Sequence, residues 1–189
     1  MDVERQHLDP ATARNSPLPR SSAALAYDAA TGSVILFGGC NGSVCSTSAD
    51  MNDTWLWNGS TWAQQFPPVS PPPRYEASIA YDAAKQRVVL FGGSSCSSSA
   101  PCTSLNDTWT WNGSTWAQQS PASSPSVRYG ASTTYDSATS NVLLIGGFSC
   151  PSSTTCSYLG DTWIWDGATW TQQRPLGSPT SRRDAGIAV

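Results

Sequence analysis

The sequence predicts an all-β protein made of three consecutive units of four antiparallel strands each. A period of 54 residues runs through the chain, and it separates Arg20, Arg74, Arg128 and Arg182. All nine Trp fall at three positions of this period, and no segment shows the 3.6-residue period of an amphipathic helix. Four-stranded units in tandem are typical of β-propeller blades. We therefore expect a partial β-propeller, with three blades in an open arc.

The first two strands of a unit are clearest in the second copy. Residues 77–81 form a short strand-like segment, and the polar residues 82–86 that follow indicate a turn. Residues 88–91 are apolar without alternation and end on Gly92-Gly93, a pattern that suits a strand covered on both faces. A Ser-rich loop with two Cys then leads to the third strand.

Trp109 and Trp111 alternate with Thr in the third strand, which places both indoles on one face. Asn112-Gly113 is a strong two-residue hairpin signal, because a type I′ turn needs positive φ at both central positions. The chain then returns through residues 114–119 as the fourth strand.

The repeat divides the chain into five parts. We expect the end of a preceding blade or a linker at 1–19, complete units at 20–73, 74–127 and 128–181, and the truncated first strand of a next blade at 182–189.

Composition excludes several classes of protein. Only 12% of the residues are charged and the formal net charge is −3, so nucleic acid is not an expected partner. No apolar run approaches the roughly 20 residues that span a bilayer, so membrane insertion is not expected. The first ten residues contain no apolar signal-peptide segment.

The order of motifs in each unit resembles the Kelch repeat in its bacterial form. An Arg precedes A-x-x-x-Y-D, an apolar strand ends in Phe-Gly-Gly, and N-D-T-W-x-W-N-G-S-T-W leads to a Pro-rich link. The third copy departs slightly, with Ile145 in place of Phe and Gly160 in place of Asn. The resemblance covers the three repeats and implies a Kelch-type propeller.

Three blades are fewer than the roughly four to eight that close a propeller. We interpret the chain as part of a longer propeller, and we keep a half-ring that completes itself by self-association as the alternative.

Chain direction predicts where ligands bind. In a four-stranded meander, the connections between strands two and three share one rim with the links from strand four to the next blade. All the long, irregular segments fall on this rim, and loops on a rigid scaffold usually carry binding. We call it the loop rim.

The six Cys fall in three local pairs: Cys40 and Cys45, Cys96 and Cys102, and Cys150 and Cys156. Local disulfides are favoured over free thiols and over a metal site, because the only His, His7, lies outside the repeats. Disulfides predict an extracytoplasmic or secreted location.

The repeated Arg and Trp have structural and binding interpretations. For Trp, burial between blades is favoured over a carbohydrate platform. For Arg, we favour a buried-rim ion pair or carbonyl contact, with the carboxylate coming from Asp53, Asp107 or Asp161 of a neighbouring blade. The best binding candidates are Arg74, Tyr75, Arg128 and Tyr129, which follow the Pro-rich links.

Catalysis has little support in the sequence. Kelch-like folds include copper-dependent sugar oxidases and sialic-acid mutarotases, but no repeat contains a His, and Glu76 is the only Glu within the repeats. We see no paired carboxylates, and we expect no cofactor and no metal. The resemblance implies a non-catalytic scaffold that binds a protein or glycan ligand. The alternative is a carbohydrate-binding, mutarotase-like or oxidase-like propeller whose active residues lie in missing blades.

Overall fold

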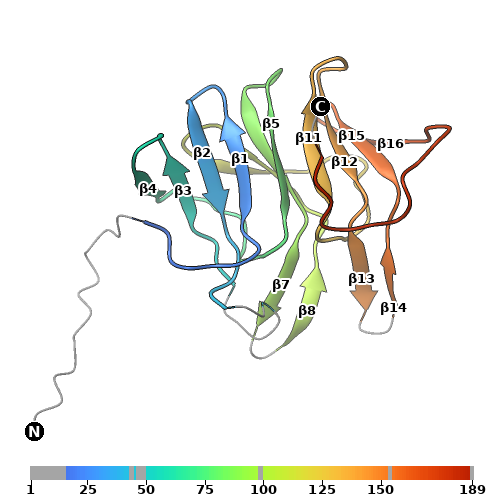
Figure 1. Ribbon diagram of the computed structural model, residues 1–189, viewed down its shortest axis with the longest axis horizontal. Helices are drawn as coiled ribbons and strands as arrows, with labels where there is room; N and C mark the ends of the chain where they lie inside the picture. Colours follow the sequence, from blue (N-terminus) through green and yellow to red (C-terminus); the bar gives the residue numbers. More distant parts are fainter. Residues whose placement is uncertain (1–15, 43–44, 46–49, 98–99, 153–154, 188–189) are drawn as a thin grey trace, which may run out of the picture.

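The computed structural model describes residues 16–42, 45, 50–97, 100–152 and 155–187, and the strands in them form three four-stranded and two two-stranded antiparallel sheets (Figure 1). The four-stranded sheets consist of β1 (Ala24–Asp28), β2 (Ser33–Phe37), β3 (Thr54–Trp57) and β4 (Trp62–Gln65); β5 (Ser78–Asp82), β6 (Arg87–Phe91), β9 (Thr108–Trp111) and β10 (Trp116–Gln119); and β11 (Ser132–Asp136), β12 (Asn141–Ile145), β15 (Thr162–Trp165) and β16 (Trp170–Gln173). The all-β prediction and the three four-stranded units are confirmed.

Each four-stranded sheet is an up-and-down meander, and the three share one register. Ala24 pairs with Phe37 in the first blade, Ser78 with Phe91 in the second, and Ser132 with Ile145 in the third. The first strands β1, β5 and β11 are neighbours in space, so they line the axis of the arc.

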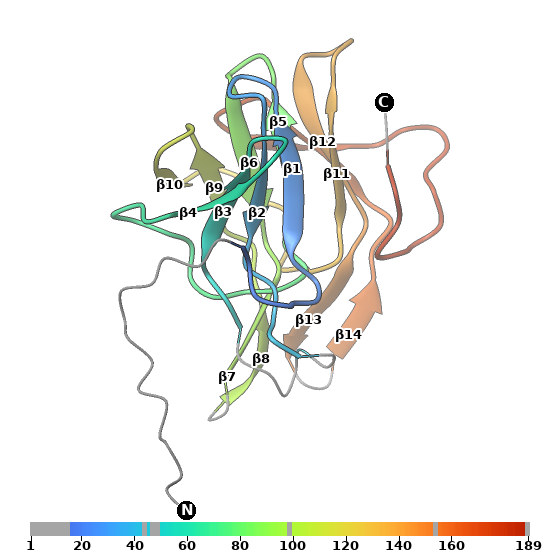
Figure 2. The ribbon, with the colours of Figure 1, turned by 60° about the vertical axis from the view of Figure 1, so that its left-hand side comes forward.

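Two of the Cys-containing connections are more regular than the sequence predicts. Instead of irregular loops, they contain the two-stranded hairpins β7 (Ser94–Ser97) with β8 (Ala100–Ser104), and β13 (Phe148–Ser152) with β14 (Thr155–Tyr158). Both hairpins extend from the same end of the arc (Figures 1 and 2). The loop rim therefore carries two projecting ribbons.

Tryptophan holds consecutive blades together. Trp116 packs edge-on against Phe37 of the preceding blade, with ring centroids 5.3 Å apart, and its Nε1 donates to Thr54 Oγ1 at 2.9 Å. Trp170 repeats both contacts one blade later, with Phe91 and Thr108. Burial of such indoles supplies much of the stabilisation of the fold. Trp116 and Trp170 are therefore buried between blades, as the sequence predicts.

The three predicted disulfides are present. The bridges Cys40–Cys45, Cys96–Cys102 and Cys150–Cys156 join Cα atoms that lie 5.3, 4.2 and 4.3 Å apart. Each bridge closes one connection between the second and third strands of a blade, so the cross-links restrain the segments that form the loop rim.

Candidate functional site

The axis of the arc opens on the loop rim at one repeated position, formed by Ser22, Glu76, Gly130 and Asp184. We call these four residues the axial mouth. They line an open recess of about 360 Å³ together with the alanines that follow the first three of them. The sequence motifs do not single out this site, although the 54-residue period places all four residues in register.

A belt of backbone hydrogen bonds fixes the axial mouth. The N–H of Glu76 donates to Ser22 O at 2.9 Å, that of Gly130 to Glu76 O at 3.0 Å, and that of Asp184 to Gly130 O at 2.9 Å. All four residues have left-handed backbone conformations, with φ between 51° and 61°. Such φ values are costly for residues other than Gly. Three of the four positions nevertheless carry side chains with polar groups.

Glu76 is the most perturbed group of the axial mouth. Burial raises the pKa of its carboxyl, and the charge of Asp184 raises it further, whereas Arg183 acts in the opposite direction. Its Oε2 is buried and has no hydrogen-bond partner among the described residues. A second carboxylate, Asp184, lies beyond the third repeat and lines the same mouth as Glu76.

An aromatic row lies beside the axial mouth. Ring centroids are 6.5 Å apart between Tyr75 and Tyr129, 5.6 Å between Tyr129 and Phe148, and 4.7 Å between Phe148 and Tyr158. The Arg183 guanidinium lies 5.7 Å from the Tyr129 ring centroid and 5.4 Å from that of Phe148. The row offers ring faces and a cation close to two carboxylates.

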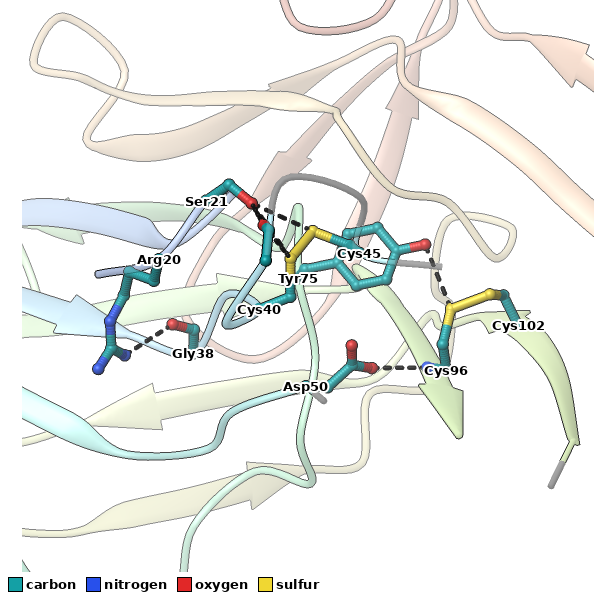
Figure 3. The surroundings of a disulfide bond; sticks show 10 residues. Arg20, Ser21, Gly38, Cys40, Cys45, Asp50, Tyr75, Cys96 and Cys102 are labelled. Atoms are coloured by element: carbon teal, nitrogen blue, oxygen red, sulfur yellow. Dashed lines mark hydrogen bonds between the residues drawn. A yellow bond between two sulfur atoms is a disulfide. The ribbon is translucent and has the colours of Figure 1, made fainter. Parts of the chain in front are cut away.

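The first disulfide supports one end of this row. Cys40 and Cys45 form a buried cluster with Tyr75, whose hydroxyl lies 3.4 Å from Cys96 Sγ (Figure 3). Asp50 Oδ2 accepts a 2.6 Å hydrogen bond from the Cys96 N–H and so links the first blade to the second (Figure 3). Burial raises the pKa of Asp50, whereas this bond lowers it. Tyr75 is thus held by both neighbouring disulfides.

The four predicted binding residues divide into two groups. The side chains of Arg74 and Arg128 are fully buried. Tyr75 is 8% exposed, and Tyr129 is half-buried within the aromatic row. A binding role for these four residues stays a prediction, and Tyr129 is the best placed of them for direct contact.

The repeated Arg forms a bidentate ion pair with the repeated Asp. Arg74 Nη1 lies 2.6 Å from Asp107 Oδ1 and Nη2 lies 2.8 Å from Oδ2, while Nη1 also donates to Gly92 O. Arg20 with Asp53 and Arg128 with Asp161 repeat this geometry. The ion pair and the carbonyl contact are as expected, but the Asp belongs to the same blade and not to a neighbouring one.

These ion pairs predict loss of stability in acid. Burial alone would raise the pKa of Asp107, but the hydrogen bonds and charge of Arg74 and the Trp109 indole N–H outweigh it and lower the pKa below its usual value. The pKa values of Asp53 and Asp161 are lowered in the same way. A carboxyl with a depressed folded pKa stabilises the fold above its unfolded pKa of about 3.9, and that contribution is lost as pH falls through the folded value. We expect the free energy of unfolding in urea to fall steeply below about pH 4. A constant value from pH 5 down through the acid range would contradict this.

The described residues contain no group of three or more His, Cys, Asp or Glu that could hold a metal ion. In the same part of the chain, no helix is long and apolar enough to cross a membrane.

Comparisons with known proteins identify the repeats. The family model described as the KLHDC2/KLHL20/DRC7 Kelch-repeats domain matches residues 1–189. A solved structure titled "Structure of YjhT" is similar, with a TM-score of 0.62 and 15% sequence identity over 84% of this chain and 47% of that one. The chain thus spans about half the length of that protein. No match was found among curated proteins. The chain belongs to the Kelch-repeat family, and its three blades form part of a β-propeller.

Proposed function

We propose that this protein is a non-catalytic Kelch-type scaffold that binds a protein or glycan ligand at the axial mouth of the loop rim. The observation that carries the proposal is Glu76, whose buried Oε2 lacks a partner among the described residues in a recess that it shares with Asp184. A buried carboxylate oxygen without a hydrogen bond is costly, so a ligand that donates to it gains that energy.

The surroundings of Glu76 indicate which chemical groups such a ligand carries. Carboxylates accept hydrogen bonds from ammonium, guanidinium and hydroxyl groups. The adjacent row, from Tyr75 to Tyr158, provides ring faces that contact apolar or planar groups. A donor-rich group on a partly apolar ligand fits both features, as in a basic peptide segment or a glycan.

Substitution of Glu76 by Gln tests this proposal while changing few atoms. The protein is screened against a glycan array and a peptide library, and each ligand found is remeasured with the variant. Loss of a charge-assisted hydrogen bond weakens binding by about tenfold or more. Asp166→Asn is the matched control, because it removes one charge at a turn on the opposite rim, where the other two repeats carry Asn58 and Asn112. Ligands that bind E76Q as tightly as the unaltered protein would overturn the proposal.

A sugar-acting propeller is the second candidate. The observation in its favour is a carboxyl whose pKa is raised by burial and by a second carboxylate, an arrangement typical of a general acid. Selective binding of glycans, together with conversion of a bound sugar that E76Q abolishes, would favour this candidate over the scaffold.

We further propose an extracytoplasmic or secreted location. The three disulfides support it, because such cross-links persist in oxidising compartments.

A further inference from the structure

We propose that the Cys96–Cys102 bridge is a reversible thiol-exchange site, at which a small external thiol becomes joined to Cys102 while Cys96 leaves as a thiolate. The inference does not depend on the proposed ligand of the axial mouth. It rests on the exposure of the bridge, on the groups that hold Cys96, and on the contrast with the other two bridges.

The bridges differ in their access to solvent. Cys40 is 0% exposed and Cys45 is 9% exposed, so the first bridge is shielded from an external thiol while the chain is folded. In the second bridge, Cys96 is half-buried and Cys102 is exposed. Disulfide exchange needs access of a thiolate to one of the two sulfurs, and exposed bridges are the labile ones. The second bridge is therefore open to attack, and Cys102 is the side that a thiol reaches first.

A hydroxyl group prepares Cys96 to leave. Tyr75 Oη lies 3.4 Å from Cys96 Sγ, and a bridged sulfur carries no hydrogen, so the Tyr75 hydroxyl is the donor (Figure 3). A hydrogen bond to the charged form of a thiol lowers the pKa of that thiol, and a thiol of lower pKa leaves faster in disulfide exchange. Burial raises the pKa of Tyr75, so its hydroxyl keeps the proton at neutral pH. The donor is thus ready for the thiolate that forms when the bridge opens.

The Cys96 backbone is anchored across the junction between the first two blades. Its N–H donates to Asp50 Oδ2 at 2.6 Å, and this bond does not involve the sulfur (Figure 3). Cys102 lies on the other strand of the hairpin, β8. Opening of the bridge therefore leaves Cys96 in place and releases Cys102 with the thiol attached. Because Cys96 stays in place, its thiolate attacks the mixed disulfide again, which makes the exchange reversible.

The exchange balances in atoms and charge. The thiolate of the external thiol attacks Cys102 Sγ, the S–S bond to Cys96 breaks, and a new S–S bond joins the thiol to Cys102. Cys96 takes both electrons of the broken bond and leaves as a thiolate beside the Tyr75 hydroxyl. In the reverse step, Cys96 attacks Cys102 and expels the thiol as its thiolate. No oxidant is needed to restore the bridge.

The third bridge has similar access but a different leaving group. Cys150 and Cys156 hold the same repeat positions as the second pair, and Cys156 is likewise exposed. Tyr129 holds the position of Tyr75, yet in the described part of the chain its hydroxyl forms no hydrogen bond with Cys150 Sγ. The Cys150 N–H donates to Ser104 Oγ at 3.4 Å and not to a carboxylate. The third bridge therefore serves as an internal comparison for the second.

Exposure of the folded whole chain to reduced glutathione, followed by trapping of free thiols with N-ethylmaleimide, tests the inference. Arg74, Arg87 and Arg128 place each bridge in its own tryptic peptide, so mass spectrometry gives three rates from one sample. We expect glutathione to appear first on Cys102, with Cys96 alkylated in the same peptide. The proposal is overturned if the second bridge stays intact, if either of the other two bridges reacts as fast, or if glutathione accumulates on Cys96 instead.

A matched pair of variants tests the donor. Tyr75→Phe removes one hydroxyl and should slow exchange at the second bridge by about tenfold, because the Cys96 thiolate loses a hydrogen bond. Tyr129→Phe removes the same atom one repeat later and should leave that rate unchanged. A merely structural role of Tyr75 has the opposite sign, since a loosened hairpin exchanges faster. Near-UV circular dichroism checks that both variants remain folded. An equal or faster rate for Y75F than for the unaltered chain would contradict the role of this hydroxyl.

Discussion

Replacing Gly92 by Ala is expected to lower the free energy of unfolding by about 3 kcal/mol or more. Gly92 directly follows the second strand of the second blade and has φ +62°, and an added Cβ would lie 2.5 Å from Arg128 O and 3.0 Å from Leu105 O. Both contacts are backbone atoms held in place, since Arg128 N donates to Leu105 O and Gly93 N donates to Arg128 O. The junction between the second and third repeats would have to open. Urea unfolding followed by Trp fluorescence measures the loss.

Gly32→Ala separates backbone conformation from steric overlap. Gly32 has φ +67°, close to that of Gly92, but no atom lies within 4 Å of its Cβ position. The equivalent residues of the other repeats, Gln86 and Ser140, adopt φ +52° and +57° with side chains present. We expect G32A to cost no more than about 1–2 kcal/mol. If G92A and G32A lowered the free energy of unfolding equally, the close approach of the next repeat would not be the reason that position 92 requires Gly.

The blade architecture could be predicted from sequence because its signals are local and recur three times. Asn112-Gly113 predicts the place of one hairpin, and the alternation of Trp109 and Trp111 predicts the strand before it. The predicted two-residue type I′ turn is wrong, because Trp111 pairs with Trp116 across a four-residue connection in which only Gly113 has a positive φ. The double glycine marks the end of the second strand. A single short apolar run does not distinguish a buried strand from a buried helix segment. Its repetition at a constant interval beside these turn signals favours the strand.

The hairpin β7–β8 was not predicted because its sequence is Ser-rich and carries little strand propensity. Backbone pairing there does not depend on an apolar face. The Cys96–Cys102 bridge joins the two strands, with Cα atoms 4.2 Å apart, and this cross-link is the signal that could have indicated a ribbon.

The prediction that the repeated Arg pairs with an Asp of a neighbouring blade is wrong for a topological reason. Arg74 precedes the first strand and Asp107 precedes the third strand of the same meander. In an up-and-down sheet, the first and third strands start at the same end. The two residues therefore meet within one blade.

The axial mouth is not apparent from the repeated motifs, because its residues differ in type. Ser22, Glu76, Gly130 and Asp184 share a position and a backbone conformation but no side-chain chemistry. A search for identical residues at the repeat interval does not detect them. The signal that does indicate the site is the shared repeat position of Glu76 and Asp184, two 54-residue periods apart.

Replacing Arg74 by Met is expected to lower the free energy of unfolding by about 3 kcal/mol, because removal of one partner leaves a charge of a desolvated ion pair unpaired. The Arg74 side chain is fully buried, and that of Asp107 is 20% exposed. The substitution also removes the donors to Gly92 O and Pro72 O, which tie the link between blades to the double glycine. Met keeps much of the apolar volume of the Arg side chain. The decrease in the free energy of unfolding therefore reports the contribution of the guanidinium group and its contacts.

Arg182→Met is the matched control for this effect. Arg182 holds the same repeat position and the same backbone hydrogen bonds to the preceding blade, yet its side chain is exposed and meets no carboxylate in the described part of the chain. We expect R182M to change the free energy of unfolding by less than about 0.5 kcal/mol. Urea unfolding of both variants at neutral pH and again at acid pH completes the test. The cost of R74M should shrink once Asp107 is protonated, because the carboxylate then needs no counter-charge. Similar costs for R74M and R182M, or a cost for R74M that does not change with pH, would show that the ion pair does not hold the blade together.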